Sequence, residues 1–236
     1  MRPRLLLLPL GALAVSACRM PAQDDATQRA RRDAMADLMA REGVRDSATL
    51  AAMRAVPRHQ FVPADVRDLA YENTPLPIGY EQTISQPYVV AFMTEQVRPR
   101  PGLKVLEVGT GSGYQAAVLA QAGCEVYTIE IVEPLATRAA ALLARLGYDR
   151  VRVRHGDGYR GWPETAPFNA VIVTAAAPEI PPALLAQLAP GGRLIMPVGP
   201  HDGVQWLVLV EKDDRGRPGQ RTLIPVRFVP LIRGGK

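Results

Sequence analysis

The feature that most constrains the fold is a short apolar run that ends in three alternating glycines. Residues 105–113 read Val-Leu-Glu-Val-Gly-Thr-Gly-Ser-Gly. Glycines directly after a strand allow positive φ angles and let a ligand approach the amide groups at the start of the next helix. From residue 101 to residue 198, apolar runs of strand length alternate with stretches of helical spacing. This alternation predicts a doubly wound α/β domain, in which helices cover both faces of a mostly parallel sheet.

The expected elements follow from the same spacing and from the positions of Gly and Pro. The parallel strands are expected at 105–108, 126–129, 151–153, 170–173 and 194–198, and the helices between them at 115–122, 134–146 and 183–188. Residues 206–211 and 226–229 are expected to pair as antiparallel strands joined by a polar turn at 213–220. Ahead of the sheet we expect two short helices separated by Gly43, and then a long irregular loop over 73–87.

The first residues of the chain differ from the rest. Arg2 and Arg4 precede an almost entirely apolar run over 5–15, and small residues stand directly before Cys18. This three-part layout is typical of a secretory signal and resembles a bacterial lipobox, whose cysteine becomes the lipidated first residue of the mature chain. We therefore interpret 1–18 as a signal segment with Cys18 as the lipidation site.

The leader also predicts where the protein is found. The polar residues 19–32 are expected to form a flexible tether, and acyl chains on Cys18 would hold the protein at a membrane surface without a spanning segment. The expected location is therefore periplasmic or membrane-anchored. The alternative is a cytoplasmic protein whose synthesis truly starts at Met20 or Met35.

Cysteine, histidine and charge patterns exclude several classes of site. If Cys18 is lipidated, Cys124 is the one cysteine left and cannot form an internal disulfide, and we expect it to be a small buried residue. The sequence shows no His or Cys cluster with metal-ligand spacing, so we predict no metal. The densest basic group, Arg150, Arg152 and Arg154, alternates with valines, which is typical of the solvated face of a strand. We therefore expect no nucleic acid partner.

The glycine turn indicates which cofactor class the domain binds. Gly109, Gly111 and Gly113 are spaced as G-x-G-x-G, whereas the dinucleotide fingerprint G-x-G-x-x-G requires glycine where this chain has Tyr114. An NAD-dependent oxidoreductase is therefore disfavoured, since the bulky Tyr114 opposes a tight pyrophosphate fit.

Three acidic residues lie in, or shortly after, three successive predicted strands. Glu107 lies in the first, Glu130 ends the second, and Asp157 follows the third. In a doubly wound sheet these strand ends meet at the switch point, where Glu130 can accept hydrogen bonds from ribose hydroxyls and Asp157 lies near an adenine. Carboxylates repel a pyrophosphate but suit the ammonium and sulfonium groups of S-adenosylmethionine. The sequence therefore predicts S-adenosyl-L-methionine as the cofactor.

On these features the chain resembles the protein-L-isoaspartate O-methyltransferase family over nearly all of 33–231. The resemblance implies a class I S-adenosylmethionine methyltransferase fold. It divides 33–236 into N-terminal helices with a substrate loop (33–100) and a cofactor-binding α/β core (101–236). The matching stretches are 55–58 with 61–62, 76–79, 82–87, 105–113, 155–158, 173–176 and 227–231.

The resemblance also implies roles for individual residues. The segment Gln82, Thr83 and Ile84 is expected to lie between cofactor and substrate, and Ser85 matches the active-site serine of the family. Glu130 matches the ribose-binding acid, and the pair Asp157-Gly158 matches the adenine-side pair. Because a carboxylate is already a nucleophile at neutral pH, no strong base is required, and Ser85 is interpreted as a hydrogen-bonding positioner.

The implied activity is methyl transfer from S-adenosylmethionine to the free carboxylate of isoaspartyl residues in damaged proteins. The methyl ester then closes to a succinimide, whose hydrolysis returns some normal aspartate. The partners are isoaspartyl proteins and peptides, and we expect a monomer. Two alternatives stay open, an anchored lipoprotein that binds peptides without turnover and a small-molecule methyltransferase with the same cofactor domain.

Overall fold

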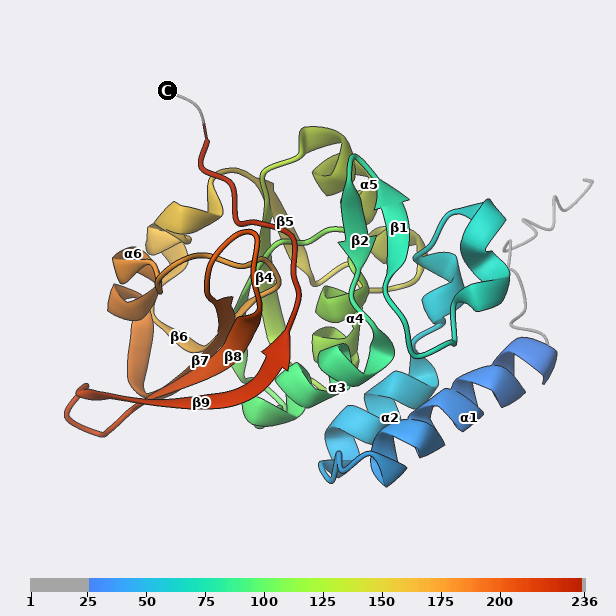
Figure 1. Cartoon of the computed structure of the whole chain (residues 1–236), viewed down its shortest axis with the longest axis horizontal. Coiled ribbons are helices and arrows are strands. Elements are labelled where there is room, and N and C mark those ends of the chain that lie inside the picture. The colour runs from blue at the N-terminus through green and yellow to red at the C-terminus, as the bar shows by residue number, and fades with distance from the viewer. Residues whose placement is uncertain (1–25, 235–236) are drawn as a thin grey trace, which may run out of the picture.

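The protein is centred on one twisted seven-stranded sheet (Figure 1). The computed structural model describes residues 26–234. The strands lie in the order β5-β4-β3-β6-β7-β8-β9. Their bounds are β3 (Lys104–Val108), β4 (Glu125–Glu130), β5 (Arg152–His155), β6 (Phe168–Val173), β7 (Leu188–Val198), β8 (Gln205–Lys212) and β9 (Pro218–Val226).

The order of the strands reverses at β3. The chain adds β4 and β5 in parallel on one side of β3, and then β6 and β7 in parallel on the other side. β8 and β9 run antiparallel to their neighbours. The predicted doubly wound sheet with C-terminal antiparallel strands is confirmed. The carboxyl ends of β3, β4 and β6 therefore meet at the switch point, where ligands of such sheets bind.

Helices cover both faces of the sheet, as the sequence predicted. They are α1 (Ala26–Arg41), α2 (Ser47–Ala55), α3 (Pro87–Gln96), α4 (Tyr114–Gln121), α5 (Glu133–Arg145) and α6 (Pro182–Ala186). Successive residues of β3 point to opposite faces, so Val105 packs in the core that α1–α5 form, and Leu106 packs in the core on the side of α6. Glu107 follows Leu106 and points to the same side as Val105.

The N-terminal helices are longer than the sequence indicated. The turn at Gly43, with φ +110°, separates α1 from α2 as expected. However, α1 already begins at Ala26, so the flexible tether predicted over 19–32 is wrong for residues 26–32. Arg32 is buried there and its Nε donates to the Arg54 carbonyl at 2.5 Å. The apolar part of an arginine side chain can pack on a neighbouring helix. The polar composition of 19–32 therefore did not exclude a packed helix. Residues 1–25, with Cys18 and the signal segment, lie outside the described part of the chain.

The segment 73–87 is more regular than predicted. It contains a small antiparallel hairpin of β1 (Leu76–Gly79) and β2 (Gln82–Ile84), which is separate from the main sheet. The prediction of an irregular loop is therefore wrong for these residues. Leu76, Ile78 and Ile84 are buried and anchor the hairpin. The two prolines in 73–77 argued against a strand in the sequence, because proline cannot donate a backbone hydrogen bond to a neighbouring strand.

The C-terminal boundaries also differ from the predicted ones. The last strand is β9, at 218–226, so the prediction of a strand at 226–229 is wrong. Most of β9 is exposed, and backbone pairing with β8 creates this edge strand without an apolar pattern. Similarly, α6 ends at Ala186 and β7 begins at Leu188, earlier than the expected 194. Leu188 pairs with Phe168 of β6, and the register then shifts across residues 189–192, which include Pro190 and two glycines, before pairing resumes at Arg193.

Two further features concern the described residues. No helix in residues 26–234 is long and apolar enough to cross a bilayer. Cys124 is buried as expected, and burial raises the pKa of its thiol to about 11.

Candidate functional site

The glycine turn after β3 has the conformation that its sequence requires. Gly109, Gly111 and Gly113 all have positive φ angles, at +98°, +53° and +89°. At Gly109 the space is also limiting, because an added Cβ would lie 2.4 Å from the hydroxyl oxygen of Thr174 at the end of β6. An alanine at Gly109 would therefore be both strained and blocked. The turn brings the backbone of β3 against β6 at the switch point.

Glu130 closes the other side of this turn. It ends β4, is 5% exposed, and accepts hydrogen bonds from the backbone N–H of Gly111 at 2.7 Å and of Val132 at 2.9 Å. Each carboxylate oxygen can accept more than one hydrogen bond, so Glu130 keeps acceptor capacity toward the cavity beside it. A buried carboxylate with free acceptor sites suits a ligand with hydroxyl donors.

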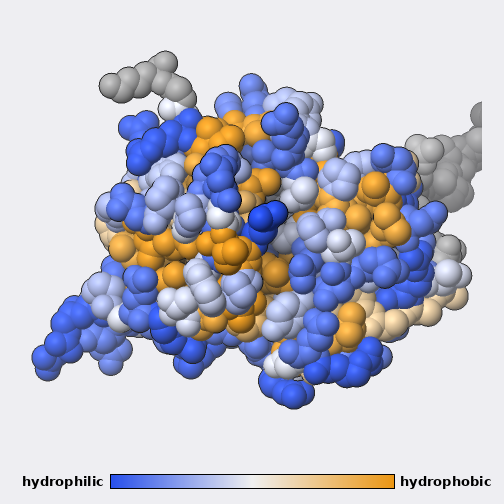
Figure 2. Space-filling view, viewed as in Figure 1, coloured by the Kyte–Doolittle hydropathy of each residue, from blue (hydrophilic) through white to orange (hydrophobic). Residues whose placement is uncertain are grey.

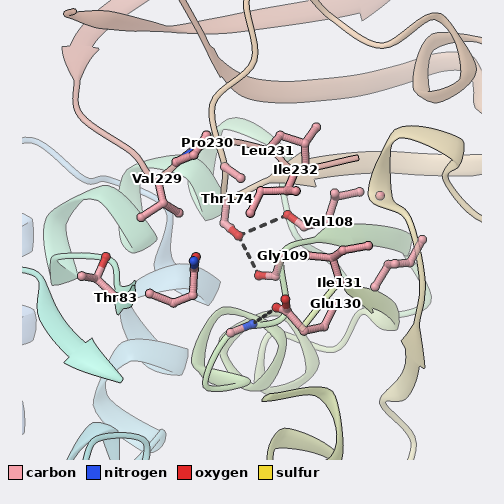
Figure 3. Close-up of a pocket in the computed structure, with 15 residues that line it drawn as sticks. Thr83, Val108, Gly109, Glu130, Ile131, Thr174, Val229, Pro230, Leu231 and Ile232 are labelled. Atoms are coloured by element: carbon pink, nitrogen blue, oxygen red, sulfur yellow. Dashed lines mark hydrogen bonds between the residues drawn. The ribbon is translucent and has the colours of Figure 1, made fainter. Parts of the chain in front are cut away.

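The C-terminal segment covers the switch point. The N–H of Ala176 donates to the Val229 carbonyl at 2.8 Å, and the N–H of Leu231 donates to the Ala176 carbonyl at 2.7 Å. Figure 3 shows residues 229–232 lying over the cavity opposite Glu130, with the Thr174 hydroxyl donating to the main chain of the glycine turn. The result is a cavity between the strand ends and the C-terminal segment.

We call this space the cofactor cavity. Among its lining residues are six predicted site residues, namely Gln82, Thr83, Gly109, Gly111, Glu130 and Gly158. The other lining residues are Val108, Ile129, Ile131, Thr174, Ala175, Val229, Pro230, Leu231 and Ile232. One hairpin, three strand ends and the C-terminal segment thus surround one space.

Five predicted residues lie outside this lining, namely Ile84, Ser85, Glu107, Gly113 and Asp157. The Asp157 carboxylate accepts from the N–H of Tyr159 at 2.9 Å, which begins a short 3₁₀ turn, and faces a neighbouring cavity with Arg154 and Arg160. Gly113 serves packing, since an added Cβ would lie 3.2 Å from the side chain of Leu143 on α5. Ile84 is buried and lines the smaller cavity described next.

A smaller cavity adjoins the glycine turn and contains Glu107. The carboxyl of Glu107 is fully buried, and neither of its oxygens has a hydrogen-bond partner among the described residues. Burial raises the pKa of Glu107 to about 8; the nearby Thr128 hydroxyl opposes this rise, and the charge of Glu130 adds to it. The side-chain oxygen of Gln115, in the same cavity, likewise has no partner among those residues. Two buried acceptors without donors call for a ligand that brings donors, and a cation is the best partner for Glu107.

Ser85 lies where this cavity meets a third one. It lines both, and its carbonyl accepts a hydrogen bond from Arg58 at 2.8 Å. Arg58 is fully buried, donates also to the Ala70 carbonyl, and stands 4.7 Å from the centre of the Tyr114 ring. Burial lowers the pKa of Arg58 to about 10, so its guanidinium stays charged at neutral pH. Arg58 therefore fixes the main chain at Ser85 from inside the protein.

We call the third space the acceptor cavity. It lies between the β1–β2 hairpin and the end of β9, and its lining includes Ser85, Tyr88, Arg227 and Phe228. Thr83 and Thr174 line all three cavities, so they mark the junction. Figure 2 shows several hydrophobic patches on the face viewed in Figure 1, separated from one another by hydrophilic surface. The arrangement suits an extended polypeptide beside a bound small molecule.

Sequence reasoning did not name all of these residues as site residues. Thr174 and the segment 229–232 line the cofactor cavity. The sequence analysis listed 173–176 and 227–231 only as stretches that match the family, without a role in the site. The signal available for Thr174 was its position directly after a predicted parallel strand. The C-terminal segment carried no such signal, because only the tertiary fold brings it back over β3 and β6.

The described residues contain no group of three or more His, Cys, Asp and Glu side chains placed to hold a metal ion. His59 lies in the N-terminal part, where its Nδ1 is 2.7 Å from the Tyr71 hydroxyl, and it lines none of the three cavities.

Gly158 offers a sharp test of how closely the 3₁₀ turn after β5 packs against Val108 at the end of β3, beside the cofactor cavity. A Cβ at Gly158 would lie 2.3 Å from Cγ1 of Val108, so Gly158→Ala is expected to lower cofactor affinity and thermal stability together. Overpacking of this kind costs about 1–3 kcal/mol. The double variant Gly158→Ala with Val108→Ala should recover much of both losses in calorimetry. Gly219→Ala on β9, whose added Cβ meets no atom closer than 3.8 Å, is the matched control. A single variant as stable as Gly219→Ala would contradict the packing argument.

Comparison with known proteins gives a consistent result. The family model "Protein-L-isoaspartate(D-aspartate) O-methyltransferase (PCMT)" matches residues 30–236. A protein-L-isoaspartate O-methyltransferase of Opitutus terrae is 55% identical over 233 residues, which cover 99% of each chain. A solved protein-L-isoaspartate O-methyltransferase matches with a TM-score of 0.78 and 30% identity, over 86% of this chain and 66% of that chain. A Plasmodium falciparum structure described as the same type of enzyme, in complex with S-adenosyl-L-homocysteine, matches with a TM-score of 0.74 and 25% identity, over 86% and 99%.

Proposed function

The chain belongs to the protein-L-isoaspartate(D-aspartate) O-methyltransferase family, and on that premise we propose which of its residues carry out the reaction. The reaction transfers a methyl group from S-adenosyl-L-methionine to the free carboxylate of an L-isoaspartyl residue and so begins its repair. The observation that carries our assignment is that Thr83 and Thr174 line both the cofactor cavity and the acceptor cavity. A methyl donor and a peptide carboxylate can therefore meet beside these two threonines.

The residues present fit S-adenosylmethionine. Glu130 would accept hydrogen bonds from the ribose hydroxyls, and Gly158 would lie beside the adenine, with Asp157 next to it in the chain. Glu107 would receive the ammonium group, because its buried oxygens otherwise lack a partner. Gln82, Thr83 and Ile84 would cover the ligand from the hairpin. When bound, S-adenosylmethionine supplies an electrophilic methyl group.

The acceptor side needs orientation and not a strong base. An isoaspartyl carboxyl has an ordinary pKa near 4, so it is an ionised nucleophile at neutral pH. We assign Ser85 the role of donating a hydrogen bond to this carboxylate, while Thr83 and Thr174 line its approach to the methyl group. Arg227, on the same cavity, adds a positive charge that favours an anionic acceptor. The C-terminal segment would exclude water from the reacting atoms.

The activity is tested by methyl transfer from labelled S-adenosylmethionine to matched peptides. One peptide carries isoaspartate and the other carries normal aspartate at the same position. We expect base-labile label on the isoaspartyl peptide alone, since methyl esters are labile to base. Cofactor binding without any transfer to the peptide would favour a binding protein without turnover, and transfer to a small molecule instead would point to another acceptor.

The role of Ser85 is tested by Ser85→Ala. We expect turnover of the isoaspartyl peptide to fall about 10-fold or more, because a hydrogen bond to a charged group is lost. The affinity for S-adenosylhomocysteine, measured by calorimetry, should fall by much less than turnover, since Ser85 is assigned to the peptide carboxylate and Glu107 and Glu130 to the cofactor. Ser47→Ala, at the exposed start of α2, is the control. Turnover equal to that of the control would remove Ser85 from the catalytic residues.

The sequence pattern of residues 1–18 supports a proposal about location. We propose that Cys18 is lipidated and that the monomeric enzyme is held at a membrane surface on the far side of the inner membrane. S-adenosylmethionine is made in the cytoplasm, so an exported enzyme would need a separate supply. Full-length protein should incorporate labelled fatty acid and sediment with membranes, and Cys18→Ser should lose both properties. Unmodified protein that begins at Met20 or Met35, as read by mass spectrometry, would support the cytoplasmic alternative.

A further inference from the structure

The β1–β2 hairpin carries the residues at the junction of the cavities, but it is not part of the main sheet. β1 pairs with β2 in a two-stranded sheet of its own, and Figure 1 shows the hairpin standing beside α5. Both residues at its tip, Tyr80 and Glu81, are exposed and have positive φ angles, at 54° and 57°. An isolated hairpin of this size is marginally stable in water, so its position depends on the elements that hold it.

Two guanidinium groups hold opposite ends of the segment between β1 and Ser85. At the far end, Arg58 donates from the core to the Ser85 carbonyl at 2.8 Å. Near the tip, Nη2 of Arg138 on α5 donates to the Ile78 carbonyl at 2.5 Å. The Ile78 side chain is buried over the glycine turn, where an added Cβ at Gly111 would lie 3.3 Å from its Cδ1. The Arg138 hydrogen bond therefore acts on the residue that seats the hairpin on the cofactor-binding turn.

We propose that Arg138 is a positioning residue that holds the β1–β2 hairpin closed over the cofactor cavity through the main chain of Ile78. This proposal rests on the roles assigned above to Thr83 and Ser85. Arg138 belongs to the helix that follows Glu130 and that packs Leu143 against Gly113. The same helix thus supports the glycine turn from beneath and reaches the hairpin from the side.

The charge of Arg138 is directed to this one contact. In the described part of the chain no carboxylate forms an ion pair with Arg138, and its guanidinium donates to the Ile78 carbonyl. A hydrogen bond from a charged donor is about twice as strong as a neutral one. Because the rest of the Arg138 residue is exposed, losing it should leave the core of the fold intact. The consequence should be confined to the hairpin.

Arg145 provides a matched control. It lies seven residues further along α5, so it projects from a similar face of the helix, and both arginines line one surface cavity. The Arg145 side chain forms no hydrogen bond or ion pair with any of residues 26–234. Arg138→Met and Arg145→Met therefore remove the same charge from the same helix face, and only the first removes a contact with the hairpin.

The test combines hydrogen exchange, ligand release and steady-state kinetics on the full chain. For Arg138→Met we expect faster amide exchange in 76–84 with unchanged exchange in α5. Dissociation of S-adenosylhomocysteine should be about ten-fold faster, and kcat/KM for the isoaspartyl peptide about ten-fold lower. The thermal midpoint should not change. Arg138→Lys should restore part of the protection, because an ammonium group can also donate to the Ile78 carbonyl.

Either of two results would overturn the proposal. Hairpin exchange and ligand release unchanged in Arg138→Met would show that Arg138 does not hold the hairpin. Equal effects in Arg145→Met would show that only the helix charge matters. If the wild-type chain bound S-adenosylhomocysteine but methylated no isoaspartyl peptide, the proposed function would fail, whereas the exchange and release measurements would still decide the role of Arg138.

Discussion

Replacing Glu130 with alanine is expected to reduce the affinity for S-adenosylhomocysteine about 100-fold or more. The carboxylate would lose two charge-assisted hydrogen bonds to ribose hydroxyls, each worth about 1.5–3 kcal/mol. The substitution would also leave the N–H groups of Gly111 and Val132 without their present acceptor, which costs about 1–3 kcal/mol for each group that stays buried. We therefore expect a lower thermal midpoint in addition to the loss of binding.

The design separates ligand binding from a purely structural role. Glu133→Ala removes a nearby exposed carboxylate from the first turn of α5 and should leave cofactor affinity unchanged. Calorimetry well below the thermal midpoint measures binding to the folded fraction alone. If Glu130 only capped the turn, Glu130→Ala would be less stable but would bind with normal affinity, and the assignment of Glu130 to the ribose would fail.

Replacing Glu107 with glutamine is expected to stabilise the ligand-free protein at neutral pH and to weaken cofactor binding. The pKa of Glu107 is raised from 4.5 to about 8, so the folded protein keeps this carboxyl protonated while the unfolded chain ionises it. Below pH 4.5 both states are protonated and the stability contribution is fully present. As the pH rises from 4.5 to 8 it is lost, and above pH 8 the loss is complete.

The size of this effect follows from the pH interval. At pH 7 the interval above 4.5 is roughly 2.5 units, which corresponds to about 3 kcal/mol at about 1.4 kcal/mol per unit. Denaturation of wild type and Glu107→Gln between pH 4.5 and 8 should give curves that diverge toward higher pH. Parallel curves would mean that Glu107 is not the group that stays protonated.

The affinity of Glu107→Gln for the ligand should fall, although its stability rises. The cofactor ammonium would favour the ionised form of Glu107, so the glutamine variant loses an ion pair that the wild type gains on binding. We expect S-adenosylhomocysteine to bind more weakly to Glu107→Gln, and calorimetry in buffers of different ionisation enthalpy should show proton release in the wild type alone. A more stable protein with undiminished affinity would show that Glu107 does not contact the ligand.

The sequence was sufficient to predict the sheet and part of the cofactor cavity. The parallel strands were recognisable because both faces of the sheet are covered, so their side chains are apolar along the whole run, as in 105–108 and 170–173. The glycine turn was recognisable because its backbone angles exclude most other residues. Glu130 could be placed because a carboxylate at the end of a parallel strand necessarily lies at the switch point.

The N-terminal and C-terminal segments show where local pattern stopped being informative. β9 is largely exposed, so pairing with β8, not an apolar pattern, makes it a strand. The hairpin at 76–84 depends on Arg58 and Arg138 from distant parts of the chain. The same holds for α1, whose first turns are polar yet packed through Arg32.

The sequence by itself therefore determined the fold class, the glycine turn and its acid, because each depends on interactions between near neighbours or on the period of the apolar residues, and its motifs identified the family. Only the tertiary structure decided that Thr83 and Thr174 join the cavities, that residues 229–232 line the cofactor cavity, and that Glu107 is buried without a partner among the described residues. Those features arise where segments far apart in the chain meet. The backbone hydrogen bonds and the burial that form at such contacts do not require a periodic pattern of residue types, so the sequence does not reveal them.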